Sequence, residues 1–124
     1  MADHPGLVAA QRAIAVLTMA LIATQFFLAG AGAFGATSFD AHRTVGSVAL
    51  VAAVLGLAIA ALTRRHVAHS AAVAGLLVLQ LILGVVGADE PWVGALHGLN
   101  AIAVMGAAGS LAQASWAPVR ARAA

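Results

Sequence analysis

Cysteine is absent from the sequence, which excludes disulfide bonds, thiolate chemistry and cysteine-ligated metals. The chain also has no glycine-rich phosphate loop, no catalytic-triad pattern and no pair of carboxylates inside an uncharged run. Hydrolase and kinase activities therefore have no support. Histidine is left as the only strong metal ligand.

Charged residues are scarce. They make up 8% of the 124 residues, whereas 63% are hydrophobic, and the mean hydropathy is +1.02. These values lie far from those of a soluble globular domain, so the lipid bilayer is the expected solvent. The few charges flank hydrophobic runs and do not gather into a basic patch. No nucleic-acid partner is therefore expected.

Four runs without Asp, Glu, Lys or Arg are long enough to cross a membrane, which takes about 20 apolar residues. The runs cover residues 13–39, 44–63, 66–88 and 91–119. They predict transmembrane helices near residues 7–30, 39–62, 67–86 and 91–116. The sequence thus predicts an all-α integral membrane protein in which residues 1–124 form a single four-helix domain.

The breaks between the runs carry turn and capping residues. Gly30, Gly32 and Gly35 are expected to end the first helix, and residues 37–40 (Thr-Ser-Phe-Asp) offer hydroxyl caps and an acid to the second. Residues 89–91 (Asp-Glu-Pro) begin the fourth in the same way. Connections this short make sequential helices antiparallel, so the predicted architecture is an up-down-up-down four-helix bundle.

Arginines predict the orientation, because cytoplasmic flanks collect positive charge. One side of the predicted bundle carries five arginines and the other carries only Arg43. The five are Arg12, Arg64, Arg65, Arg120 and Arg122. We therefore expect a multi-pass protein of a bacterial inner membrane with both termini in the cytoplasm.

An internal repeat is the most informative pattern. A shift of 55 residues places Gln25 on Gln80 and His42 on His97, and each glutamine precedes its histidine by 17 residues. In an up-down bundle this repeat predicts a pseudo-two-fold axis along the membrane normal. His42 and His97 would then lie at one depth near the outer surface, with Gln25 and Gln80 at the same level.

Two facing imidazoles in a membrane have two interpretations. They can bond to neighbouring helices and stabilise the bundle by roughly 1 kcal/mol per contact. They can also ligate one b-type heme between the second and fourth helices, with His42 and His97 as axial ligands. Glycines around this level would leave room for a macrocycle, although small residues also let membrane helices pack closely. These glycines are Gly30, Gly32, Gly46, Gly84, Gly87, Gly94 and Gly98.

Neighbouring polar residues also have alternatives. Arg43 is expected either to pair with a heme propionate or to point to solvent at the membrane surface. Asn100 is expected to bond a helix backbone rather than the ring of His97. His66 and His69 have no repeat-matched partner, so a second heme on the cytoplasmic side is not expected.

Short motifs around these residues resemble a known family. Residues 25–30 (Gln-Phe-Phe-Leu-Ala-Gly), 40–46 and 97–100, with Gln80, look like small bacterial four-helix membrane proteins of uncharacterised function. They are also similar to one half of heme A synthase, each half of which is a four-helix bundle with histidines on its second and fourth helices. The resemblance covers most of the chain and implies heme ligation by His42 and His97.

The chain departs from heme A synthase in having one half, no intramembrane acid and no cysteine. These departures favour a heme site over heme-modifying chemistry. The first functional hypothesis is a one-heme membrane cytochrome that exchanges electrons with quinone or a respiratory membrane complex. The alternatives are a membrane oxidoreductase related to heme A synthase and a heme-free structural subunit. A homo-oligomer is compatible with each of them.

Overall fold

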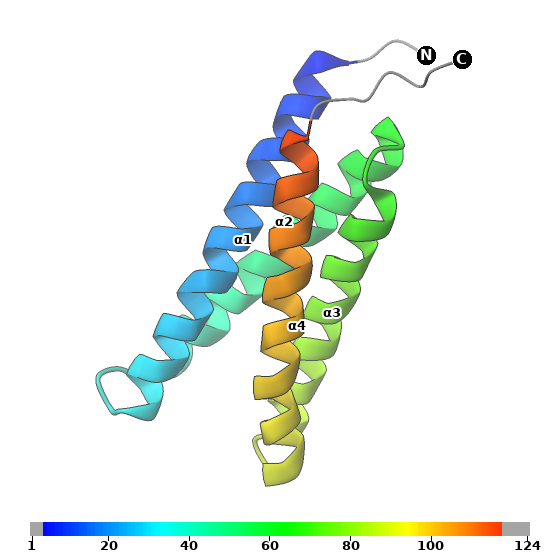
Figure 1. Cartoon of the computed structure of the whole chain (residues 1–124). Coiled ribbons are helices and arrows are strands. Elements are labelled where there is room, and N and C mark those ends of the chain that lie inside the picture. Colours follow the sequence, from blue (N-terminus) through cyan, green and yellow to red (C-terminus); the bar gives the residue numbers. More distant parts are fainter. Residues whose placement is uncertain (1–3, 118–124) are drawn as a thin grey trace.

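The computed structural model describes residues 4–117 and consists of four long helices (Figure 1). Their bounds are Pro5–Ala33 (α1), Asp40–Thr63 (α2), Val67–Val86 (α3) and Pro91–Trp116 (α4). All four are long and apolar enough to cross a membrane. The chain is therefore a multi-pass membrane protein with the predicted up-down-up-down fold. Arg120 and Arg122, which entered the orientation argument, lie outside the described residues.

The helices form two hairpins, α1–α2 and α3–α4. Each helix packs against two others, so α1 and α3 face each other across one diagonal and α2 and α4 across the other. In Figure 1 the tips of the hairpins diverge at the lower end, whereas at the upper end α4 lies beside α1 and α3 beside α2. We call the lower end, with residues 34–39 and 87–90, the histidine end. We call the upper end, where α1 begins and α4 ends, the terminal end.

The helix boundaries follow local chemistry. Proline occupies the first turn of α1 and α4, where its missing N–H leaves no donor unpaired. The helix predicted over 7–30 continues through Gly30 and Gly32 to Ala33, and the chain turns at Gly35, whose φ of +74° favours glycine. Among the glycines at this end of α1 only Gly35 has a positive φ, so Gly30 and Gly32 do not end the helix.

Burial repeats between the two hairpins. Seven pairs of buried residues are separated by the 55-residue shift. They are Ala15 and Ser70, Thr18 and Val73, Ile22 and Leu77, Ala49 and Val104, Ala53 and Ala108, Gly56 and Leu111, and Ala60 and Ser115. The same faces of corresponding helices thus form the core, which is the predicted pseudo-two-fold repeat. The large exposed side chains are mostly aliphatic or aromatic, as lipid-facing surfaces require.

Candidate functional site

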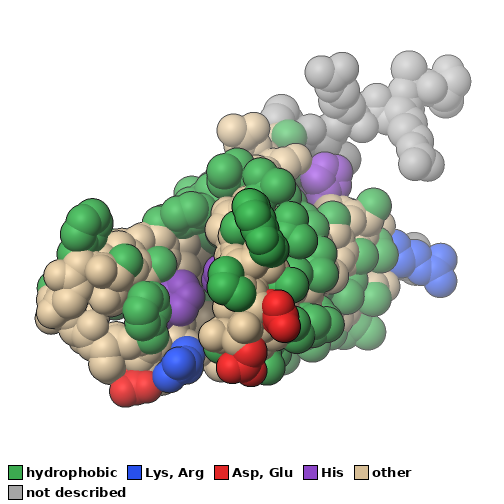
Figure 2. Space-filling model, turned by 90° about the horizontal axis from the view of Figure 1, so that it is seen from below, with side chains coloured by type: hydrophobic (Ala, Val, Ile, Leu, Met, Phe, Trp, Pro, Cys, Tyr) green, Lys and Arg blue, Asp and Glu red, His purple; other side chains and the backbone are tan. Residues whose placement is uncertain are grey.

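His42 and His97 come together at the histidine end. His42 lies in the first turn of α2 and His97 in the second turn of α4, and the centroids of their rings are 6.1 Å apart with an interplanar angle of 63°. Figure 2, which looks at this end, shows histidine side chains between the two halves of the molecule. Residues far apart in the sequence and on diagonal helices therefore share one site.

Both imidazoles are oriented by the same backbone contact. Nδ1 of His42 donates to the carbonyl oxygen of Gln25 at 3.3 Å, and Nδ1 of His97 donates to that of Gln80 at 3.0 Å. A carbonyl oxygen only accepts, so the proton in each contact belongs to Nδ1. Each neutral ring is thereby left with a lone pair on Nε2. Histidines that bind a metal through Nε2 commonly make such a hydrogen bond with Nδ1.

A closed polar network surrounds His97. The Gln80 amide nitrogen lies 3.1 Å from His97 Nε2, to which it donates, and 3.0 Å from the His97 carbonyl oxygen. Nδ2 of Asn100 donates to Gln80 Oε1 at 2.6 Å and to the Leu76 carbonyl oxygen at 3.0 Å. The preferred expectation for Asn100, a bond to helix backbone, agrees with this contact. Its bond to Gln80 was not anticipated.

The corresponding contacts around His42 are incomplete. The Gln25 amide nitrogen is buried without a hydrogen-bond partner. The repeat shows one cause of the difference, because the position that corresponds to Asn100 is Val45, which offers no amide to hold the oxygen of Gln25 as Asn100 holds that of Gln80. The two halves therefore share the histidine and glutamine but differ in how the glutamine is held.

Glycines line part of the site. A Cβ at Gly46 would lie 3.2 Å from Gln25 Oε1, and one at Gly84 would lie 3.1 Å from the His97 ring. Gly87, directly after α3, lies close to the start of α4, since a Cβ there would be 2.6 Å from the backbone of Gly94. Gly98, by contrast, has open space on its Cβ side. Gly46 and Gly84 thus make room for the polar side chains, and Gly87 lets α3 and α4 touch.

Phe39 is a further component that the sequence analysis missed. Its ring stands edge-on to His42, with centroids 6.1 Å apart and an interplanar angle of 88°. The same ring covers Gly32, where a Cβ would lie 2.9 Å from it. Phe39 thus connects the end of α1 to the imidazole. The available signal was an aromatic residue three positions before a histidine.

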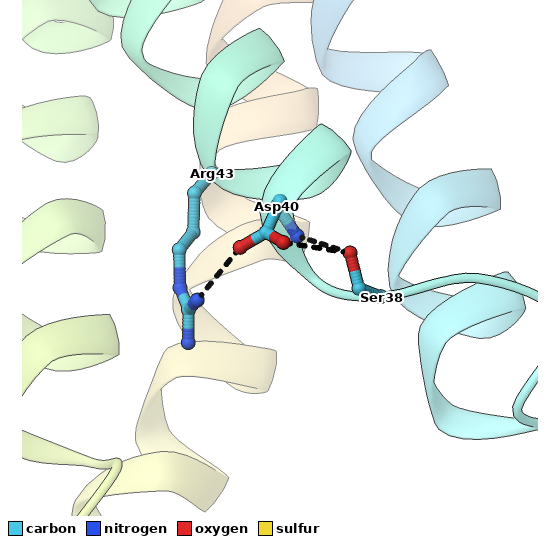
Figure 3. A network of polar contacts seen from close by, with 3 residues as sticks. All are labelled: Ser38, Asp40 and Arg43. Atoms are coloured by element: carbon cyan, nitrogen blue, oxygen red, sulfur yellow. Dashed lines mark hydrogen bonds and ion pairs between the residues drawn. The ribbon is translucent and has the colours of Figure 1, made fainter.

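Arg43 lies at the rim of the site. Its guanidinium donates to Asp40 at 3.2 Å, and the two side chains are 74% and 78% exposed. The Ser38 hydroxyl donates to the Asp40 carboxylate at 2.9 Å and accepts from the Asp40 N–H (Figure 3). The acid predicted for the first turn of α2 is present as Asp40, but the N-cap residue is Phe39 and makes no side-chain capping hydrogen bond. Exposed pairs of this kind contribute little to stability, so Arg43 can exchange its partner cheaply.

The other histidines lie away from this site. The rings of His66 and His69 are 6.3 Å apart at the terminal end, in the turn between α2 and α3 and the first turn of α3. Burial, the nearby Arg65 and His69 all lower the pKa of His66 below its usual value. His4 precedes α1 at the same end.

Comparison with known proteins places residues 25–88 in a family described as "Family of unknown function (DUF6220)". This segment is just over half of the chain. The chain belongs to DUF6220. No curated protein and no solved structure matches it.

The part matched to DUF6220 includes Gln25, His42 and Gln80 but ends before His97. It runs from the last turns of α1 through α2 and α3. The family match therefore covers one of the two imidazoles. The second is brought to the site by the packing of α4.

Among residues 4–117 no cluster of three or more His, Cys, Asp or Glu side chains is placed to hold a metal ion. Zinc sites take three or four protein ligands. The two imidazoles are too few for such a site. Two imidazoles are enough for a cofactor that itself supplies most of the ligands of its metal ion.

Proposed function

We propose that this chain is a membrane b-type cytochrome, in which His42 and His97 are the axial ligands of one heme b that transfers electrons. One observation carries the proposal. The rings of two imidazoles lie 6.1 Å apart, and both have Nδ1 tied to a backbone carbonyl and the lone pair on Nε2. This tautomer is the one that an axial ligand needs.

The ring separation supports the same assignment. Metal–imidazole bonds of about 2 Å place the ring centres of two opposed ligands about 6 Å apart. The observed distance is 6.1 Å. A porphyrin supplies the remaining four nitrogen ligands, so two histidines are sufficient. When bound, the heme iron would supply one-electron oxidation and reduction.

Other residues have supporting roles in this proposal. Gln25, whose buried amide nitrogen lacks a partner, and Gln80 are the polar groups beside the imidazoles. Gly46 on α2 and Gly98 on α4 have no side chain and therefore occupy little volume. Arg43 would exchange Asp40 for a heme propionate, since both are carboxylates and the present ion pair is exposed.

A heme-free structural subunit is the second candidate, and one observation favours it. Gln80 donates to His97 Nε2, the atom that would bind iron, and Asn100 completes the network. The His97 half is thus satisfied without any ligand. Heme binding would require the Gln80 amide to turn away from His97 Nε2.

Location and partners belong to the same proposal. Arg12, Arg64 and Arg65 lie at the terminal end of the described chain, opposite Arg43, which supports cytoplasmic termini and a heme near the outer face of a bacterial inner membrane. A quinone or a respiratory membrane complex is the proposed electron partner. A homo-oligomer remains compatible with the lipid-facing surfaces.

Optical spectroscopy tests the central claim. Protein purified from heme-replete cells should carry heme, with a low-spin ferric spectrum and a sharp α band after reduction, because two imidazoles supply a strong ligand field. A protein that stays colourless, both as purified and after addition of hemin, would favour the structural subunit.

A further inference from the structure

A small cavity lies inside the bundle, away from the histidine site. Its volume is about 10 Å³, and residues of all four helices line it. A space of about 10–15 Å³ is what one water molecule requires. Thr18 in α1 and Ser70 in α3 contribute the two hydroxyl groups to its wall.

Both hydroxyl groups lack a hydrogen-bond partner. Thr18 and Ser70 are each 2% exposed, and neither Thr18 Oγ1 nor Ser70 Oγ is bonded. Other helical hydroxyls donate to carbonyl oxygens in the preceding turn, as those of Thr24, Ser47 and Ser115 do. An unsatisfied buried hydroxyl is costly, and no bulk water reaches the interior of a membrane bundle. The two hydroxyl groups therefore need a hydrogen-bond partner, and the cavity beside them has room for one.

The cavity also lies on the pseudo-two-fold axis. The repeat relates Thr18 to Val73 and Ser70 to Ala15, and all four residues line the cavity. α1 and α3 face each other across a diagonal of the bundle and do not pack directly. Each hairpin thus contributes one hydroxyl to the cavity, from opposite sides of the bundle.

We infer that the cavity is a binding site for one ordered water molecule, which bridges Thr18 Oγ1 and Ser70 Oγ. Water can donate to one hydroxyl and accept from the other, so it satisfies both. Gln11 also lines the cavity, but its amide nitrogen donates to the Arg65 carbonyl oxygen at 2.8 Å and its Oε1 accepts from Thr63 at 3.3 Å. The water completes a polar layer that reaches inward from the terminal end.

A cation is a poor occupant of the same space. No carboxylate lines the cavity, and Asp40, Asp89 and Glu90 lie at the histidine end. Transfer of an unpaired charge into a low-dielectric interior is far costlier than transfer of a neutral water molecule. The wall consists of two hydroxyls, the Gln11 amide and aliphatic groups, all of them neutral, and it therefore fits water.

The water site is separate from the histidine site. Buried Ile22 stands between Thr18 and Gln25 along α1, and Leu77 stands between Ser70 and Gln80 along α3. Seven residues of helix span about 10 Å, so an apolar layer parts the two sites. The inference therefore holds whether or not heme binds.

Magnetic resonance can detect the water directly. In isotope-labelled full-length protein in lipid nanodiscs, magnetisation should pass from water to the methyl groups of Thr18 and Val73, two residues that line the cavity. It should stay absent at Ile22 and Leu77, which are buried in the apolar layer. No transfer at Thr18 and Val73 would show a dry cavity and overturn the inference.

A double-mutant cycle provides a second readout, because the water needs both hydroxyls. Thr18→Val and Ser70→Ala should each lower the Tm, since a single removal leaves the water with one partner. The double variant should melt no lower than the worse single variant, because the water is expelled and no polar group is left unsatisfied. Additive losses would contradict the bridge.

The matched control is Thr24→Val in the same helix, whose hydroxyl donates to the Ala20 carbonyl oxygen on the exposed side. It should leave the water signal at Thr18 unchanged. A hydroxyl-to-hydroxyl contact without water would also be non-additive, but it would give no magnetisation transfer. The two measurements together thus distinguish a bridging water from a direct bond.

Discussion

At the scale of single residues, a backbone contact selects the tautomer of a neutral imidazole. His42 and His97 both use Nδ1 to reach the carbonyl of a glutamine on the preceding helix. The sequence interval of 17 residues is what brings each glutamine and histidine to one level of an antiparallel hairpin. The repeat thus encodes an orientation of the ring as well as a position.

The first prediction concerns these two rings. In heme-loaded protein, His42→Ala or His97→Ala should convert a low-spin spectrum into a high-spin one or lose the heme, since one axial ligand is removed. Absorption and electron paramagnetic resonance spectra measure the change. His69→Ala is the control and should leave the spectrum unaltered, because His69 lies at the terminal end. Unaltered spectra in both axial variants would refute ligation.

The second prediction uses the unequal glutamines. Gln80→Leu removes an amide that contacts His97 and Asn100, so it should destabilise the heme-free protein by roughly 1–3 kcal/mol. Gln25→Leu removes a buried amide nitrogen that has no partner and should be neutral or stabilising. Unfolding of the two variants in detergent, each compared with the unmodified chain, measures the difference. Equal losses would show that the halves are equivalent.

At the scale of helices, hydropathy was sufficient for the number and order of the elements. The predicted spans 67–86 and 91–116 coincide with α3 and α4. α1 is longer than the predicted 7–30, because Gly30 and Gly32 continue the helix and Gly32 packs against the Phe39 ring. Gly35, which has a positive φ, marks the true break.

The polar contacts were less accessible to sequence analysis. Helical spacing placed the paired histidines at one level, but it does not assign a hydrogen-bond partner to each amide. The bond from Asn100 to Gln80 and the unpartnered amide nitrogen of Gln25 are therefore seen only in the structure. Gly98, expected near the site, has open space on its Cβ side.

The third prediction tests the contact between α3 and α4. Gly87→Ala places a methyl group 2.6 Å from the backbone of Gly94, which cannot yield as a side chain does. The helices must separate, at a cost of about 1–3 kcal/mol. Gly106→Ala is the matched control in α4, where a Cβ meets open space, and should be neutral or slightly stabilising. Thermal unfolding in detergent compares the two, and a harmless Gly87→Ala would contradict the close approach.

At the scale of the whole molecule, the repeat produces a bundle with two different ends. Corresponding residues are buried in both hairpins, yet the histidine end carries imidazoles and amides while the terminal end carries Gln11 and arginines. Ile22, Leu77 and Val104 form an apolar layer between them. This apolar layer separates the polar groups at one end from those at the other.

The last prediction concerns which end faces the cytoplasm. Because the chain has no cysteine, single introduced cysteines report their own exposure. Ala88→Cys, in the α3–α4 turn, should react with a membrane-impermeant thiol reagent added to intact cells. Ala68→Cys, in the first turn of α3 at the terminal end, should react only after the membrane is opened, because the arginines there are retained on the cytoplasmic side. The reverse labelling pattern would place the imidazoles, and any heme they bind, near the cytoplasmic face, where the proposed electron partners would have to be sought.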